Sequence, residues 1–147
     1  MTDAEYLEWF NREFWRTLHG PGVASLSRLQ RDALCVMNFQ IELNNGGMHQ
    51  YLFNSSGDFA QETPEVFRRI GSHEAARLLE EANAFFGPSD PPTDRETRMA
   101  ALLALPKSAE DRIYALSQEF YDAEDRGLSL ADLFDAYVLA QKDKGGG

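Results

Sequence analysis

Polar side chains that could bind a ligand gather in one short stretch of this sequence, between residues 42 and 58. His49, Gln50 and Asn54 stand there among apolar residues. An imidazole and two amides can both donate and accept hydrogen bonds, so together they could line a polar pocket for a small ligand or a peptide. The competing interpretation is structural, because asparagine and glycine also end helices and form the turns between them.

In the structural interpretation, this stretch is a junction between two helices. Asn44, Asn45 or Gly46 ends the first helix in a left-handed conformation, and the Asn45 side chain caps the second, which residues 54–57 then end. A β-hairpin is a third interpretation, because Asn-Gly is a strong hairpin signal. The hairpin would need a break upstream, and no glycine or proline lies between residues 23 and 45. The helical junction is therefore favoured over the hairpin.

No pattern in the sequence indicates a catalytic or metal site. The three histidines are His19, His49 and His73, and none has a second ligand at the short spacing of helical metal sites. Cys35 is the only cysteine and lies in an apolar run, which predicts a buried and unreactive thiol. No glycine-rich phosphate loop follows a strand. We therefore expect a protein that is not an enzyme and that uses no metal and no cofactor.

The elements that must position these residues have the pattern of helices throughout. Capping signals and apolar residues at helical spacing recur along the chain, and glycine or proline separates the segments. The sequence predicts an all-α fold of seven or eight helices in a single compact domain over residues 1–141. One long, buried helix over about residues 25–44 is expected at its centre. Residues 142–147 are expected to form a disordered polar tail.

The first predicted helix carries an unusually wide apolar surface. Trp9 and Trp15 lie beside its main apolar stripe. Such a surface is either buried on two sides or forms an aromatic patch that another subunit covers.

Negative charge dominates the composition, with 24 acidic residues against 14 basic ones and a net charge of −10. This argues against direct binding to nucleic acid, which requires cations to neutralise phosphates. A basic protein partner is compatible with it. Arg126 is the only base between residues 117 and 135. The candidate partner-binding residues in this acidic stretch are Glu119, Asp122, Glu124, Asp125 and Asp135.

The first residues and the lengths of the apolar runs indicate where in the cell the protein is expected. No apolar run approaches the length of a membrane span, and the first residues lack the basic and apolar regions of a secretory signal. We expect a cytoplasmic protein with no membrane partner.

The glycine-rich stretch also carries a family resemblance. Residues 43–57 read Leu-Asn-Asn-Gly-Gly-Met-His-Gln-Tyr-Leu-Phe-Asn-Ser-Ser-Gly. This pattern resembles the hallmark of a family of small acidic bacterial proteins related to a DNA-mimic protein, and the similarity covers roughly residues 26 to 140. The junction, with its candidate pocket, comprises Asn44, Asn45, Gly46, Gly47, His49, Gln50, Tyr51, Asn54 and Ser55.

The resemblance implies an all-α fold, and it makes a homodimer an expectation. It also implies a role in which surface carboxylates take the place of DNA phosphates on a DNA-binding protein. That role depends on the acidic residues and not on the hallmark. Two hypotheses follow: regulation of a basic, DNA-binding partner through the acidic surface, or binding of a small ligand or peptide at the junction.

Overall fold

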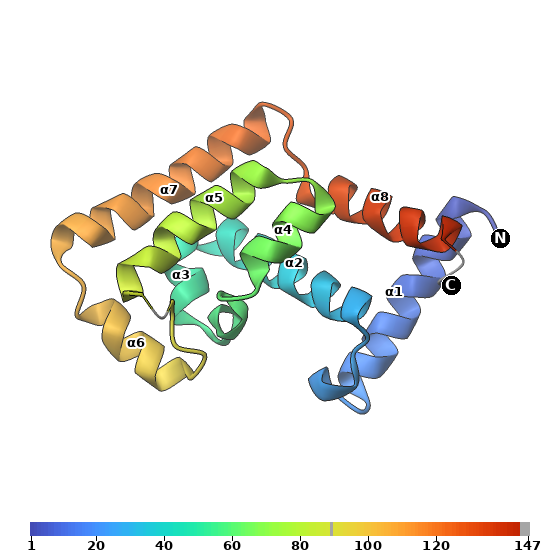
Figure 1. The fold of residues 1–147 in the computed structure, drawn as a ribbon, viewed down its shortest axis with the longest axis horizontal. Coiled ribbons are helices and arrows are strands. Elements are labelled where there is room, and N and C mark those ends of the chain that lie inside the picture. Colours follow the sequence, from blue (N-terminus) through green and yellow to red (C-terminus); the bar gives the residue numbers. More distant parts are fainter. Residues whose placement is uncertain (89, 145–147) are drawn as a thin grey trace.

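Eight α-helices and three short 3-10 helices make up the computed structural model, which describes residues 1–88 and 90–144 and contains no strand within them (Figure 1). The α-helices are α1 (Asp3–His19), α2 (Arg28–Asn45), α3 (Met48–Phe53), α4 (Thr63–Ile70), α5 (His73–Asn83), α6 (Arg95–Leu103), α7 (Lys107–Asp125) and α8 (Leu130–Asp143). The 3-10 helices are η1 (Val23–Ser25), η2 (Ser55–Phe59) and η3 (Ala84–Phe86). The prediction of a single all-α domain with seven or eight helices is confirmed.

The central helix is α2, which contacts α3, α4 and α8 (Figure 1). Phe39 of α2 is completely buried, and its ring makes edge-to-face contacts with Tyr51, Phe67 and Phe120 at centroid distances of 5.1, 4.9 and 5.3 Å. Aromatic pairs in this geometry add to the stability that burial alone provides. One side chain of α2 therefore ties α3, α4 and α7 into a common core.

The start of α2 differs from the predicted position near residue 25. Ser27 accepts a hydrogen bond from the Gln30 backbone N–H at 3.1 Å, and the Gln30 side chain accepts one from the Ser27 N–H at 2.9 Å. This reciprocal capping box fixes the first turn of α2 at Arg28. Val23–Ser25 forms the separate helix η1 instead.

The C-terminal boundary also needs a correction. Helix α8 continues to Asp143, so the first two residues of the expected tail, 142–143, are helical. The Lys142 ammonium lies 3.2 Å from the Asp3 carboxylate of α1, which fixes this end of α8 against the N-terminus. Residues 145–147 of the expected tail lie outside the described residues.

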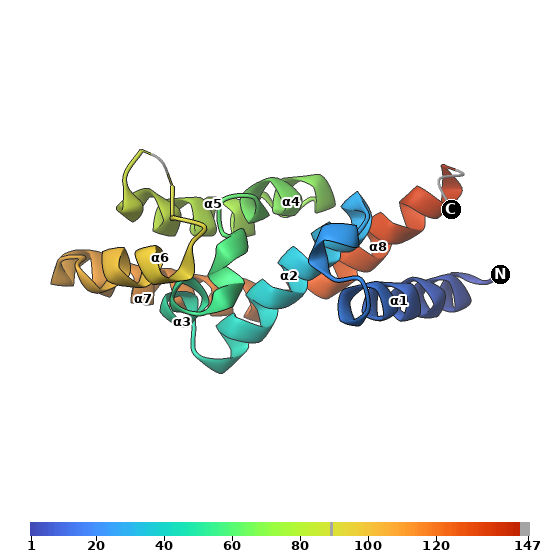
Figure 2. The same ribbon diagram turned by 90° about the horizontal axis from the view of Figure 1, so that it is seen from below.

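Helices α1, α8 and the first half of α2 form one end of the molecule, while α3, α5, α6 and α7 form the other (Figure 2). Helix α1 contacts α8 and η1. Both termini lie at the α1 and α8 end (Figure 1). Among residues 1–88 and 90–144, no helix combines the length and the apolar character needed to cross a membrane.

Candidate functional site

The hallmark stretch is a helix junction, and its tightest point is Gly47. Helix α2 includes Asn44 and Asn45, and Gly46 follows it with an extended φ of −164°. The expected left-handed residue at 44–46 is therefore wrong: the positive φ, 92°, belongs to Gly47, which precedes α3. The N-cap residue of α3 is Gly47, and Asn45 makes no capping hydrogen bond to this helix, so the predicted cap by Asn45 is also wrong. At Gly47, glycine tolerates the positive φ without the steric cost that a side chain would add.

Helix α7 holds the junction from the other side. The Met48 backbone N–H donates a hydrogen bond to Ser117 Oγ at 2.8 Å, and both groups are buried. A Cβ atom at Gly47 would approach Ser117 Oγ to 3.0 Å. The Tyr121 hydroxyl donates to the Leu43 carbonyl oxygen at the end of α2. Since the N-cap residue Gly47 has no side chain that could cap α3, Ser117 of α7 supplies an acceptor for the first turn of this helix.

The two amides of the candidate pocket are engaged within the chain. Gln50 Nε2 and Asn54 Nδ2 donate to the same oxygen, Oε2 of Glu42, at 2.9 and 3.0 Å. A Cβ atom at Gly46 would fall 1.9 Å from Gln50 Oε1, so any larger residue there would push Gln50 away from Glu42. Hydrogen bonds to a carboxylate are stronger than those between neutral groups. Glu42 thus links the end of α2 to α3.

His49, Gln50 and Asn54 do line one hollow, together with Phe53, and its volume is about 350 Å³. The His49 and Phe53 rings are stacked 6.3 Å apart. The hollow is the pocket that the sequence predicts, but two of its donors already serve Glu42. The ligand-binding alternative for this junction stays a prediction.

The rest of the hallmark packs or supports a loop. Tyr51 is completely buried, and burial raises the pKa of its phenol. Asn44, Asn45 and Ser55 are exposed. Gly57 lies against the buried guanidinium of Arg98, and a Cβ atom there would come within 2.8 Å of Arg98 Nε. The hallmark residues therefore mainly support the packing of α2, α3, η2 and α6 against one another.

The environment of Cys35 agrees with the sequence analysis. Cys35 is completely buried as predicted, and burial raises the pKa of its thiol to about 12. Very little thiolate therefore exists at neutral pH. In the described part of the chain, no group of three or more His, Cys, Asp and Glu side chains is arranged to hold a metal ion.

One of the five predicted partner-binding acids is compensated inside the chain. The Glu119 carboxylate lies 3.1 Å from the Arg112 guanidinium and 4.0 Å from that of Arg77 on α5. Its negative charge is therefore already balanced, and we correct its assignment as a free acid of the partner surface.

Among the described residues, the other predicted acids of α7 have no ion-pair partner. Asp122 and Asp125 are exposed, and Glu124 is half-buried. Burial raises the pKa of Glu124, and the neighbouring charge of Asp125 adds to the effect. The one base in this stretch, Arg126, donates to Glu74 of α5 at 2.9 Å and so does not neutralise them.

Helix α8 adds two further acids to those of α7, Asp132 and Asp135. Burial and, secondly, the neighbouring carboxylate of Asp132 raise the pKa of Asp135. At the start of α8 the Ser129 hydroxyl accepts a hydrogen bond from the Asp132 backbone N–H at 3.2 Å, so Ser129 provides the cap and the Asp132 carboxylate does not. We define the acidic patch as Asp122, Glu124, Asp125, Asp132 and Asp135; in the described part of the chain, none of these carboxylates has an ion pair or a side-chain hydrogen bond.

Comparison with known protein families places the junction and the acidic patch in one family. The model of the family described as "DMP19-like protein" matches residues 24–141. The chain belongs to this DMP19-like family. No curated protein and no solved structure matches the chain.

The DMP19-like match includes the whole junction and the whole acidic patch, and it leaves out α1, which ends at His19. The predicted family resemblance is thereby confirmed. The uncompensated state of the acidic patch had no sequence signal, because it depends on ion pairs such as Arg126–Glu74, between residues 52 positions apart.

Proposed function

We propose that this protein acts without catalysis, as a DNA mimic that occupies the DNA-binding surface of a basic protein. The observation that carries the proposal is the acidic patch, whose five carboxylates find no compensating cation in the described part of the chain. A basic partner would supply those cations. Membership of the DMP19-like family supports the same role.

The size of the acidic patch sets what it can imitate. Duplex DNA carries about one charge per 1.7 Å of axis, so five carboxylates correspond to roughly 9 Å of duplex. Asp122 and Asp125, like Asp132 and Asp135, are three residues apart on a helix, a spacing that places Cβ atoms about 5–6 Å apart. One patch therefore offers a short imitation of a phosphate row.

We therefore include in the proposal that two copies associate and lengthen this surface. Leu103 of α6 and Tyr114 of α7 are 69% and 68% exposed, and they offer apolar area for such a contact. Sedimentation equilibrium of the wild type and of a Leu103→Ser, Tyr114→Ser variant tests this point. We expect the wild type to form a dimer and the variant to be monomeric. A wild type that stays monomeric at high concentration would contradict the proposed association.

Two variants with equal net charge test the mimicry. The patch variant carries Asp122→Asn, Glu124→Gln, Asp125→Asn and Asp135→Asn. The control variant carries Glu8→Gln, Asp90→Asn, Glu96→Gln and Glu110→Gln, which removes four charges outside the patch. DNA-binding proteins captured from the source cytosol by the wild type are purified, and displacement of labelled DNA from each is measured.

Wild type and control are expected to displace the DNA with similar affinity, and the patch variant at least about tenfold more weakly, because the lost interactions are direct. The affinity of the wild type should also fall as salt rises. Equal losses in both variants would indicate a net-charge effect and contradict the role of the patch. An unimpaired patch variant would contradict the mimicry itself.

A further inference from the structure

Three helices leave an apolar groove at the end of the molecule where α1, α2 and α8 come together. The residues that line it include Phe14 and Trp15 of α1, Met37 of α2, and Ala131 and Phe134 of α8. The groove has a volume of about 170 Å³, and Trp15 is 42% exposed beside it. A contiguous apolar surface of this kind, reachable from solvent, marks an interaction site more often than a single exposed apolar residue does.

The size of the groove selects the kind of occupant. Pockets for small molecules usually measure about 300–1,000 Å³, so this groove is better matched to one large side chain. Ile41, one helical turn beyond Met37, is 47% exposed and extends the apolar surface of α2. A protein segment that inserts an apolar side chain and rests on this surface fits the groove.

The charge at the groove is negative on the α8 side. Of the described residues that line it, Asp135 is the only charged one, and Asp132 lies one turn earlier. Neither carboxylate has an ion pair in the described part of the chain. An apolar segment that carries lysine or arginine beside its apolar side chain therefore complements the groove in both respects.

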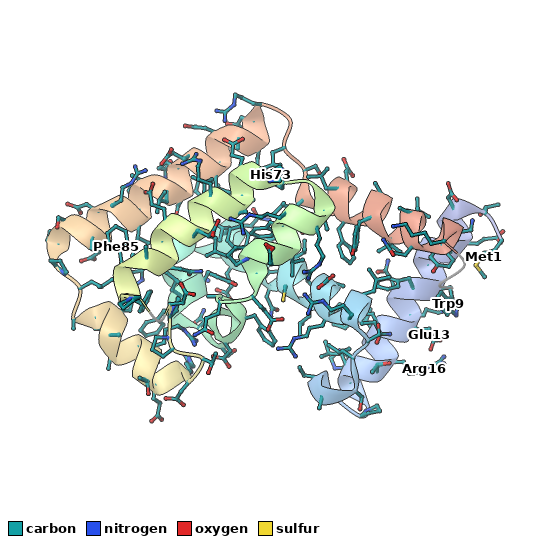
Figure 3. The ribbon with its side chains drawn as sticks, viewed as in Figure 1. Met1, Trp9, Glu13, Arg16, His73 and Phe85 are labelled. Carbon is teal, nitrogen blue, oxygen red and sulfur yellow. The ribbon has the colours of Figure 1, made fainter. Side chains whose placement is uncertain are left out.

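Helix α1 carries four acidic and two basic residues, so its net charge does not oppose such a segment. Arg16 pairs with Glu13 at 3.0 Å, and both project from successive turns of α1 together with Trp9 (Figure 3). Glu8 and Arg12 are one turn apart and of opposite charge. Among the described residues that line the groove, the charge comes from Asp135 of α8.

The wall that α1 forms lies outside the region that the family model matches, which begins at residue 24. Phe14 and Trp15 thus belong to a part of this chain that is not in the matched region. The groove exists only because α1 packs beside α2 and α8. Any selectivity that it provides is a property of this chain rather than of the matched region.

Resting on the proposed function, we propose that this groove receives one apolar side chain from a cationic helical segment of the basic partner. The lysine or arginine residues that flank that side chain pair with Asp132 and Asp135. Amphipathic helices commonly bind in this way, with apolar anchors in a groove and charged residues at its edge. The acidic patch then attracts the partner, and the groove selects among basic partners.

Two synthetic peptides test the groove. Both are lysine-rich helices of equal length and charge; one carries phenylalanine at the centre of its apolar face, and the other carries alanine there. The protein carries Trp9→Phe, which leaves Trp15 as its single tryptophan. Titrations record the dissociation constant and the emission wavelength of Trp15. Ala131→Met partly fills the groove, and Ala136→Met makes the same change at an exposed position of α8 that does not line it.

We expect the phenylalanine peptide to bind about tenfold more tightly than the alanine peptide, because it buries a large apolar side chain in the groove. We also expect it to shift Trp15 emission to shorter wavelength. Ala131→Met should remove this preference, and Ala136→Met should keep it. If both peptides bound with equal affinity and left Trp15 emission unchanged, the proposed role of the groove would be overturned. The proposed role of the acidic patch would not be affected.

Two further outcomes separate the proposals. If neither peptide bound, both proposals would fail: the attraction of cationic partners and the role of the groove. A shift of Trp15 emission that follows protein concentration in the absence of peptide would show that a second copy occupies the groove, and would overturn its assignment to a basic partner.

Discussion

Arg98 Nε donates a hydrogen bond to the Leu52 carbonyl oxygen at 2.6 Å, and this contact fixes the last turn of α3 to α6. The Arg98 side chain is completely buried. Its remaining nitrogens donate to the Asn54 and Pro92 carbonyl oxygens and to the Asp58 carboxylate. One guanidinium therefore satisfies backbone carbonyl oxygens at the end of α3, in the segment after it and in the loop before α6.

Replacement of Arg98 by methionine should lower the free energy of unfolding by about 3–5 kcal/mol, because buried acceptors lose their donor. Arg98→Lys should recover only part of this, since an ammonium cannot reproduce the guanidinium fork. Urea denaturation followed by circular dichroism gives the values. Arg95→Met is the control, because Arg95 is exposed and makes one long hydrogen bond to the Phe53 carbonyl oxygen. Similar losses in the Arg98 and Arg95 variants would contradict this role of Arg98.

Gly57 is required by the same arrangement. A Cβ atom there would lie 2.7 Å from the Tyr51 carbonyl oxygen and 3.0 Å from that of Leu52. Backbone atoms cannot move aside easily, so Gly57→Ala should cost about 1–3 kcal/mol. Ser55→Ala, at an exposed position of the same 3-10 helix, should change stability by less than about 0.5 kcal/mol. Thermal denaturation of both variants checks the difference, and an undisturbed Gly57→Ala protein would refute the steric explanation.

The fold was predictable because its signals are local. The Thr2–Glu5 capping box predicts the start of α1, and the structure forms both of its hydrogen bonds. The start of α2 was harder, since Ser25 and Ser27 are both possible caps. Only Ser27 has Gln30 three residues later to complete a capping box. Local hydrogen bonds therefore decide helix boundaries more sharply than residue type does.

The acidic patch was only partly predictable, for a physical reason. Clustered acids are visible in a sequence, but whether each is free depends on cations brought close by folding. Glu119 is compensated by Arg77 of α5, which is 42 positions away, and Arg126 is drawn to Glu74. Packing of α5 against α7 sets both pairings. The sequence shows where the acids cluster, and tertiary contacts determine which of them have an ion pair.

Ser117→Ala should destabilise the junction by about 1–3 kcal/mol, because the buried Met48 N–H would lose its only side-chain acceptor among the described residues. Ser108→Ala removes the same group from an exposed position of α7 and should have little effect. Hydrogen exchange of the Met48 amide gives a local measurement beside global denaturation. Unchanged protection of that amide in Ser117→Ala would contradict the assigned hydrogen bond.

The acidic patch should stabilise partner binding at some cost to the fold. Burial raises the pKa of Glu124 and of Asp135, so in the folded chain both groups hold their protons more tightly than in the unfolded chain. Their ionised forms therefore lower stability above the folded-state pKa, and this penalty disappears as pH falls below it. Glu124→Gln and Asp135→Asn should each raise stability at pH 7, by less than about 1 kcal/mol at these partly exposed sites.

Glu81 gives a control of opposite sign. The Arg112 guanidinium lowers the pKa of Glu81, so its ionised form stabilises the fold above the unfolded-state pKa, and that contribution is lost as pH falls through the folded-state pKa. Glu81→Gln should therefore lower stability at pH 7 and leave partner binding unchanged. Urea denaturation from pH 4 to pH 8, with partner binding measured on the same variants, separates the two groups of acids. If Glu124→Gln and Asp135→Asn destabilised the fold as Glu81→Gln does, their carboxylates would be structural rather than reserved for a partner.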